Sequence, residues 1–375
     1  MKRQLKFFLC LTVFSMVILT GCGNGKQETV ESSPLPSQAP VETQAPAETS
    51  MPVESPEPMV ITAGSREELK NAMAGAIEGL CPWLTAEIAG DWLAQPEMDV
   101  RNLYYEIYAQ HPELKYVYDL EISVDGSQLV CTFRYMPYKT GDFPEGFAGQ
   151  AVSSIPELIA VAEENMGQET VPVRITNPVL EPDAMNRALQ QAGGGYLLCM
   201  LNRDATAIQY SAPYNLSMED CLAALAEADQ LAEQVIAQVI TGDMSQREKA
   251  EALYAYVTST VSYDQRYYSD RNNMPYESQT ALGALRDGIA ICGGYSHAVK
   301  LLFEKVGIPC FNVTGKYFSE NHMWNIALLD GQWLWFDATS DRGSTGEFGF
   351  LRFGLTELDG TKYTWDQDEV QWLIG

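Results

Sequence analysis

The fold is decided by residues 280–298, which read TALGALRDGIAICGGYSHA. At the centre of this stretch lies Cys292, followed by Gly293, Gly294 and a run of helical character. A helix N-terminus favours the thiolate form of a cysteine, because the helix dipole and the free N–H groups stabilise negative charge. The alternative is a small core side chain, since free cysteine is among the most buried residue types.

A β-hairpin is predicted downstream of this stretch. Residues 325–329 and 332–336 are apolar-rich runs separated by Asp330 and Gly331. An Asp-Gly pair between two such runs is the strongest short-range signal for a hairpin with a type I′ turn. The two-residue turn also fixes the register of the two strands.

The predicted register places a histidine beside an aspartate. Counting back from the turn, Trp324 faces Asp337 and His322 faces Thr339. Side chains alternate across a strand, so His322 and Asp337 share a face on a diagonal where β-carbons lie roughly 7 to 8 Å apart. Such an aspartate fixes the imidazole tautomer and supports its positive charge while the imidazole takes the thiol proton. Cys292, His322 and Asp337 are therefore the candidate catalytic residues.

Five motifs in this part of the chain resemble the core of the transglutaminase-like superfamily, and they are C-G-G-Y, G-I-P, V-T-G, N-H-M-W-N and W-L-W-F-D-A-T-S-D. The resemblance covers about residues 243–341. It implies a papain-related α+β fold in which the helix with the nucleophilic cysteine packs on an antiparallel sheet with the histidine and aspartate. By that match Cys292 is the nucleophile, His322 the general base and acid, and Asp337 the orienting acid.

The chain departs from the family pattern at a few positions without losing a catalytic group. Ala290 and Ile291 stand where many relatives have Gly-Val, and Met323 stands where alanine is common. Tyr263 and Asp264 also resemble a family motif that precedes the cysteine. A core tyrosine with a capping aspartate explains this pair equally well.

The oxyanion of a thioester reaction needs two hydrogen-bond donors. The backbone N–H of Cys292 is a natural first donor. Gln279, Tyr263 or another backbone group is the candidate for the second. His297, five residues after the cysteine, is expected to be a structural helix histidine.

Composition limits the classes of partner. The chain has 375 residues, of which 46% are hydrophobic, enough for a sizeable core and more than one domain. Its 50 acidic and 24 basic residues give a net charge of −26, which argues against a nucleic acid bound through a basic surface. No CxxC pair or histidine cluster indicates a metal site, and no cofactor is expected.

The N-terminus predicts a bacterial lipoprotein. Residues 1–21 combine a basic start with an apolar run that is short for a membrane span, as in a signal peptide. Residues 19–22, L-T-G-C, resemble the lipobox, so Cys22 is expected to become the lipidated first residue; an ordinary signal peptide is the alternative. Residues 22–59 are rich in Pro, Ser and Glu and predict a disordered tether. The expected location is outside the cytoplasm, anchored to the cell membrane.

The remaining cysteines do not form a convincing disulfide framework. Besides Cys10, Cys22 and Cys292, the chain has an odd number of them in apolar segments. Most are expected to be buried thiols, and one or two disulfides stay open as an alternative. These cysteines are Cys81, Cys131, Cys199, Cys221 and Cys310.

Two regions follow the tether. Residues 60–215 predict an α+β accessory region, in which a weak repeat is either chance or the sign of two similar subdomains. It opens with a helix over 65–79 that starts at a capping-box spacing. Residues 216–375 form the predicted catalytic domain, beginning with a long alanine-rich helix over 217–240.

The function expected from these features is that of a surface-anchored thiol enzyme. It would hydrolyse amide bonds of a surface or cell-wall peptide through a thioester on Cys292, with no nucleic-acid partner and an open oligomeric state. A cross-linking transglutaminase and a non-catalytic scaffold are the alternatives. Trp324, Trp333 and Trp335 could line a substrate cleft, although aromatics on a central hairpin usually belong to the core.

Overall fold

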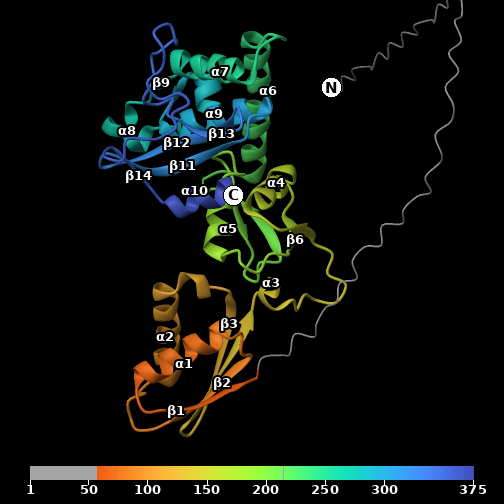
Figure 1. The fold of residues 1–375 in the computed structure, drawn as a ribbon, viewed down its shortest axis with the longest axis vertical. Coiled ribbons are helices and arrows are strands. Elements are labelled where there is room, and N and C mark those ends of the chain that lie inside the picture. The colour runs from red at the N-terminus through yellow and green to blue at the C-terminus, as the bar shows by residue number, and fades with distance from the viewer. Residues whose placement is uncertain (1–56, 214) are drawn as a thin grey trace, which may run out of the picture. The chain divides into compact units, whose positions relative to one another are not determined.

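The computed structural model describes residues 57–213 and 215–375 (Figure 1). The predicted signal peptide, Cys22 and all but the end of the predicted tether lie outside these residues. The described part is a mixed α+β structure with sheets in its N-terminal half and a further sheet near the C-terminus. None of its helices combines the length and the apolar character needed to cross a membrane.

The first sheet combines strands and helices in the succession βαβαββ. Its elements are β1 (Met59–Ala63), α1 (Arg66–Glu78), β2 (Trp83–Ile88), α2 (Pro96–Gln110), β3 (Val117–Asp125) and β4 (Gln128–Tyr135). The strand order is β1-β2-β4-β3, with β1 parallel to β2 and the other pairs antiparallel. The predicted cap of α1 is present, since the Ser65 hydroxyl accepts a hydrogen bond from the Glu68 N–H. Helix α2 begins at Pro96, a residue that suits the first helical position because its φ is fixed and it lacks an N–H.

The second sheet repeats this arrangement. After α3 (Pro137–Thr140) come β5 (Gln150–Val152), α4 (Ile155–Glu164), β6 (Thr170–Ile175), α5 (Pro182–Leu189), β7 (Leu198–Leu201) and β8 (Ala207–Ser211). The order is β5-β6-β8-β7, again with a parallel first pair followed by antiparallel pairs. The weak repeat in the sequence therefore corresponds to two subdomains of one topology.

The C-terminal core places helices against an antiparallel sheet. Its elements are α6 (Met218–Val239), α7 (Gln246–Thr260), β9 (Ser262–Tyr263), α8 (Arg266–Ser269), β10 (Ile289–Ala290), α9 (Cys292–Lys305), β11 (Cys310–Tyr317), β12 (Glu320–Leu329), β13 (Gln332–Phe336), β14 (Tyr363–Trp365) and α10 (Gln367–Ile374). The sheet order is β13-β12-β11-β14, and β9 and β10 form a short parallel pair. Helix α9 packs on the sheet, where Phe303 meets Phe336 edge to face at 5.4 Å between ring centroids.

The predicted hairpin is present with the predicted register. β12 and β13 pair so that Leu329 lies opposite Gln332. Asp330 and Gly331 both have positive φ, 53° and 78°, as a type I′ turn requires. Trp324 and Trp335 of this hairpin are buried in the core, and the partly buried Trp333 packs against it.

The structure also contains elements that the sequence patterns did not indicate. These are the short strands β1, β2, β5 and β14 and the C-terminal helix α10. The cysteines at 81, 131, 199, 221 and 310 are buried and free, so the structure has none of the disulfides left open above.

Candidate active site

Cys292 is the first residue of α9, as predicted. It is the one cysteine among the described residues that is not buried. The two glycines after it have a steric role, because the segment before the helix runs close to them. A β-carbon on Gly294 would lie 2.7 Å from the Ser278 carbonyl oxygen, and one on Gly293 would lie 3.0 Å from that of Gln279. Glycine at these positions therefore lets the helix N-terminus meet this segment.

Asp264 forms hydrogen bonds that hold the segment preceding α9. Its carboxylate accepts hydrogen bonds from the Ser278 hydroxyl at 2.6 Å and from the Arg266 guanidinium at 2.9 Å. These hydrogen bonds, that from Arg266 first, lower the pKa of Asp264 to about 2 against the opposing effect of burial. Tyr263 and Asp264 were explained either as a family motif or as a core tyrosine with a capping aspartate. For Asp264, this geometry fits the structural explanation.

His322 and Asp337 meet as the hairpin register predicts. The His322 Nε2 lies 2.9 Å from the Asp337 Oδ2. Since an ionised carboxylate only accepts, Nε2 carries the proton and Nδ1 is the ring nitrogen left for the Cys292 thiol. Burial lowers the pKa of His322, but hydrogen bonds with Asp337 and Cys292 raise it to about 9. The ring is therefore held between the carboxylate and the thiol.

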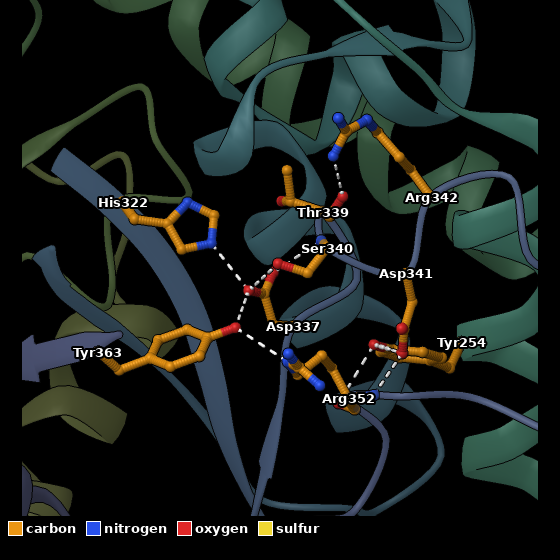
Figure 2. A network of polar contacts seen from close by, with 9 residues as sticks. All are labelled: Tyr254, His322, Asp337, Thr339, Ser340, Asp341, Arg342, Arg352 and Tyr363. Carbon is orange, nitrogen blue, oxygen red and sulfur yellow. Dashed lines mark hydrogen bonds and ion pairs between the residues drawn. The ribbon is translucent and has the colours of Figure 1, made fainter. Parts of the chain in front are cut away.

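The Asp337 carboxylate is held by more than the histidine (Figure 2). Its Oδ2 also accepts from the Ser340 hydroxyl at 2.6 Å and from the Tyr363 hydroxyl at 2.7 Å, while Oδ1 accepts from the Ser340 N–H at 3.0 Å. Burial alone raises the pKa of Asp337, yet the hydrogen bonds from His322, Ser340 and Tyr363 lower it overall. The carboxylate is thus ionised and fixed in orientation.

A second buried carboxylate shapes the loop after β13. Asp341 accepts from the Tyr254 hydroxyl at 3.0 Å and from the Arg352 N–H at 2.7 Å, and Figure 2 shows this cluster beside Asp337. Arg352 in turn donates from Nε to the Tyr363 hydroxyl at 3.3 Å. The loop between β13 and β14 is therefore tied to α7 and to the aspartate that orients His322.

His297 has a structural environment. It is buried, and its Nδ1 accepts from the Asn312 amide at 3.1 Å. Asn312 accepts in turn from the Asn325 amide, which also donates to the Ser296 carbonyl. Burial, followed by the charge of Lys300, lowers the pKa of His297 to about 4. The ring is neutral and ties α9 to β11 and β12.

A cleft of about 620 Å³ opens at Cys292 and His322. This volume falls within the usual range of ligand sites, about 300 to 1,000 Å³. Gln279 lines the cleft, whereas Tyr263, the other side chain considered for the oxyanion, lines a neighbouring hollow instead. None of the three hairpin tryptophans lines the cleft.

Several residues of the site were not anticipated from the sequence. Ser340 lies three residues after Asp337 within the D-A-T-S-D motif. This short spacing is the sequence feature that could have indicated its hydrogen bond to Asp337. Tyr363 comes from β14, and Arg187 reaches the cleft from α5, far away in the sequence. Among residues 57–213 and 215–375, no cluster of three or more His, Cys, Asp or Glu side chains is placed to hold a metal ion.

Comparison with protein families agrees with this geometry. Residues 233–338 match the model described as the transglutaminase-like superfamily. This part of the chain is a transglutaminase-like domain. It contains α7, α9 and the strands β11 to β13 with Cys292, His322 and Asp337. The matched residues follow the two repeated sheets in the sequence.

Solved structures similar to the chain are distant. A TGase has a TM-score of 0.28 and 14% identity, covering 80% of this chain and 62% of that one. A candidate cysteine protease from Cytophaga hutchinsonii has a TM-score of 0.25 and 18% identity, covering 40% and 55%. A candidate protease from Parabacteroides distasonis has a TM-score of 0.22 and 10% identity, covering 58% of this chain and 35% of that one. The chain thus spans less than two thirds of each of these proteins. The comparison with curated proteins gave no match.

Proposed function

We propose that the chain is a thiol hydrolase of peptide amide bonds, with Cys292 as nucleophile. The observation that carries this proposal is the position of His322 between the Asp337 carboxylate and the Cys292 thiol. A nucleophile, a base within reach of it and a third group that orients the base form the arrangement used for covalent acyl transfer.

The reaction has two steps. His322 holds the proton of the thiol on Nδ1 as an imidazolium, and the thiolate sulfur of Cys292 attacks the carbonyl carbon of the amide. Collapse of the tetrahedral oxyanion breaks the C–N bond, and the proton passes from His322 to the departing amine. Water then attacks the thioester with His322 as base, which releases the acid and restores the thiol. The Cys292 N–H at the start of α9 is our candidate for the first oxyanion donor, and the Gln279 side chain is our candidate for the second.

Asp337 acts on His322 rather than on the substrate. It holds the Nε2–H tautomer and balances the imidazolium that forms when the thiol loses its proton. The hydroxyls of Ser340 and Tyr363 keep the carboxylate in place.

The alternative of amine transfer has less support from the cleft. A cross-linking enzyme must bind a lysine-like amine well enough to exclude water, which is present at about 55 M. The cleft contains the cationic side chains of Arg271 and Lys316, which have no ion-pair partner among the described residues and disfavour the binding of another ammonium group beside them. A non-catalytic scaffold is the other alternative, and the presence of all three catalytic side chains argues against it.

We also propose that the enzyme acts outside the cytoplasm, anchored by lipid on Cys22. The L-T-G-C sequence at residues 19–22 and the apolar run before it support this proposal. The substrate would then be a peptide or protein at the cell surface, such as a cell-wall stem peptide.

The proposal is tested by comparing wild type with Cys292→Ala. Wild type should react with a thiol-directed electrophile at Cys292 and release free acid from a peptide library, and Cys292→Ala should do neither. Cys221→Ala, which removes a buried thiol, is the matched control and should keep both activities. Equal peptide release by the Cys292→Ala protein would overturn the assignment. Faster incorporation of a labelled amine than release of acid would favour a transglutaminase instead.

A further inference from the structure

The catalytic cleft reverses the charge balance of the chain. The whole sequence has 50 acidic and 24 basic residues, yet the cleft has more cations than anions. Its charged side chains are Arg187, Arg271, Lys316, Asp366 and Glu369. Positive charge is therefore concentrated where the substrate would lie.

The two acids of the cleft already have a partner. Arg187 of α5 forms an ion pair with Asp366, with 2.9 Å between Nη1 and Oδ2. Glu369, one turn further along α10, also interacts with Arg187. These three side chains together have a net charge of −1, and with Arg271 and Lys316 the cleft has a net charge of +1.

Arg271 and Lys316 have no ion-pair partner within residues 57–213 and 215–375. The Arg271 guanidinium lies 4.7 Å from the centre of the Tyr267 ring, which lines the cleft as well. Stacking on an aromatic face holds the planar group while its N–H edges stay free. A guanidinium presented in this way suits two parallel hydrogen bonds to a carboxylate.

Lys316 reaches the cleft from the sheet. It lies on β11 opposite Asn321 of β12, and both side chains are exposed and line the cleft. Thr314 stands two residues earlier on the same face of the strand and lines the cleft too. This face of the sheet thus offers an ammonium group with an amide and a hydroxyl beside it.

We propose that Arg271 and Lys316 bind a carboxylate of the peptide substrate, next to the amide bond that Cys292 attacks. This inference rests on the proposed function, because it concerns the same cleft and the same thiol. The carboxylate belongs either to an acidic side chain or to the C-terminus of the peptide. The net charge of −26 repels an anionic peptide at a distance, but screening limits that repulsion to about 8 Å at physiological salt. Inside the cleft the two unpaired cations dominate.

The test uses alkylation of Cys292 in the full-length protein, which requires no turnover. Three probes share one warhead: N-iodoacetyl-glutamine amide is neutral, N-iodoacetyl-glutamate amide has a side-chain carboxylate, and N-iodoacetyl-glutamine has a terminal carboxylate. The rate constant at Cys292 is measured for each by mass spectrometry of the digested protein. One or both carboxylate probes should react faster than the neutral probe, by about two- to fivefold for each exposed cation. The faster probe identifies which carboxylate is recognised.

Neutral variants connect this preference to the two side chains. Arg271→Gln and Lys316→Gln should each reduce the ratio of the carboxylate-probe rate to the neutral-probe rate, and the double variant should bring this ratio to about one. Arg101→Gln removes an exposed cation outside the cleft and should keep the preference of wild type. The inference, but not the proposed function, would be overturned if the double variant preferred the carboxylate probes as strongly as wild type does. It would also be overturned if wild type showed no such preference. If no probe reacts at Cys292, the proposed function is overturned with it. If the preference is present but no peptide is hydrolysed, only the proposed function fails.

Discussion

At the scale of single residues, Asp337 has the densest set of contacts in the site. It accepts four hydrogen bonds, three of them from side-chain donors on one oxygen. An asparagine has the same shape but places an N–H₂ group against those donors. The Ser340 and Tyr363 hydroxyls can rotate to accept from it, whereas His322 must change its tautomer.

We therefore expect Asp337→Asn to fold and to lose most of its activity. The wrong His322 tautomer should reduce kcat by about 10²- to 10⁴-fold, while KM changes little. Steady-state hydrolysis of a peptide found for wild type, together with a thermal melt, provides the measurement. Asp359→Asn, at an exposed loop aspartate, is the matched control. Full activity in a folded Asp337→Asn protein would remove Asp337 from the mechanism.

His322 makes stability depend on pH. Its pKa is raised to about 9 from an ordinary value of 6.5, so the folded state binds the proton more tightly than the unfolded state. This contribution is fully present below about pH 6.5 and is lost as the pH rises through about 9. Its size is about 2 to 3 kcal/mol of unfolding free energy.

Urea unfolding of wild type and His322→Gln at pH 6 and pH 9.5 measures this effect. The difference between the two proteins should change with pH in the direction of a less stable wild type at pH 9.5. A difference that is constant over this range would show that His322 is not held as an imidazolium in the folded protein.

At the scale of elements, the sequence determined local geometry well. The Asp-Gly turn fixed the register of β12 and β13, and that register alone brought His322 to Asp337. The start of α9 at Cys292 followed from its glycines and apolar run. These features depend on contacts between residues close in sequence, where strand alternation and turn chemistry decide the outcome.

The residues that reach the site from distant parts of the sequence were not predictable in this way. β14 has three residues, too few for an alternation pattern, and it reaches the site only by pairing with β11. Its Tyr363 is separated from Asp337 by a loop whose path depends on buried hydrogen bonds to Asp341. Arg187 lies on another sheet's helix. No residue spacing in the sequence indicates that Tyr363 and Arg187 lie at the site.

The packing of Gly294 at the start of α9 allows a specific prediction for the effect of a substitution. A β-carbon there would lie 2.7 Å from the Ala290 β-carbon and 2.9 Å from the Thr280 carbonyl oxygen, both tighter than normal contact. Gly294→Ala should therefore move the segment away from the start of α9 and cost about 1 to 3 kcal/mol of stability. Activity should fall further, because the Cys292 N–H would move.

The control for this variant is Gly242→Ala, whose β-carbon meets nothing within 4 Å. Denaturant unfolding and alkylation of Cys292 by iodoacetamide should distinguish the two proteins. Wild-type stability and reactivity in Gly294→Ala would mean that the segment adapts without disturbing the helix N-terminus.

At the scale of the whole molecule, the two repeated sheets precede one transglutaminase-like domain. The second sheet's region takes part in the cleft, since Gly195 and Arg187 line it and the Gly195 carbonyl accepts from the Tyr276 hydroxyl at 2.8 Å. The first sheet's residues are absent from the residues that line the cleft. The boundaries predicted for these regions stay a prediction.

Lipidation at Cys22 predicts how the whole protein partitions. In its native cells the wild-type protein should enter the detergent phase, and its mass should include the lipid. Cys22→Ser should leave the protein in the aqueous phase or unprocessed. Cys81→Ser, at a buried cysteine far from the lipobox, controls for the loss of a thiol. Membrane partitioning of an unmodified Cys22→Ser protein would refute the anchor.

The order of the site along the chain bears on its biosynthesis. The nucleophile at Cys292 is made first, followed by His322, Asp337 and finally Tyr363 on β14. During translation, Cys292 is therefore synthesised before His322 and Asp337, the groups proposed to activate its thiol. The growing chain exposes an ordinary cysteine, and its reactivity develops only when the later strands have assembled on α9. Under the proposed mechanism, the activity would thus be acquired only after synthesis of the domain, which keeps the thiol from attacking the nascent polypeptide and its neighbours.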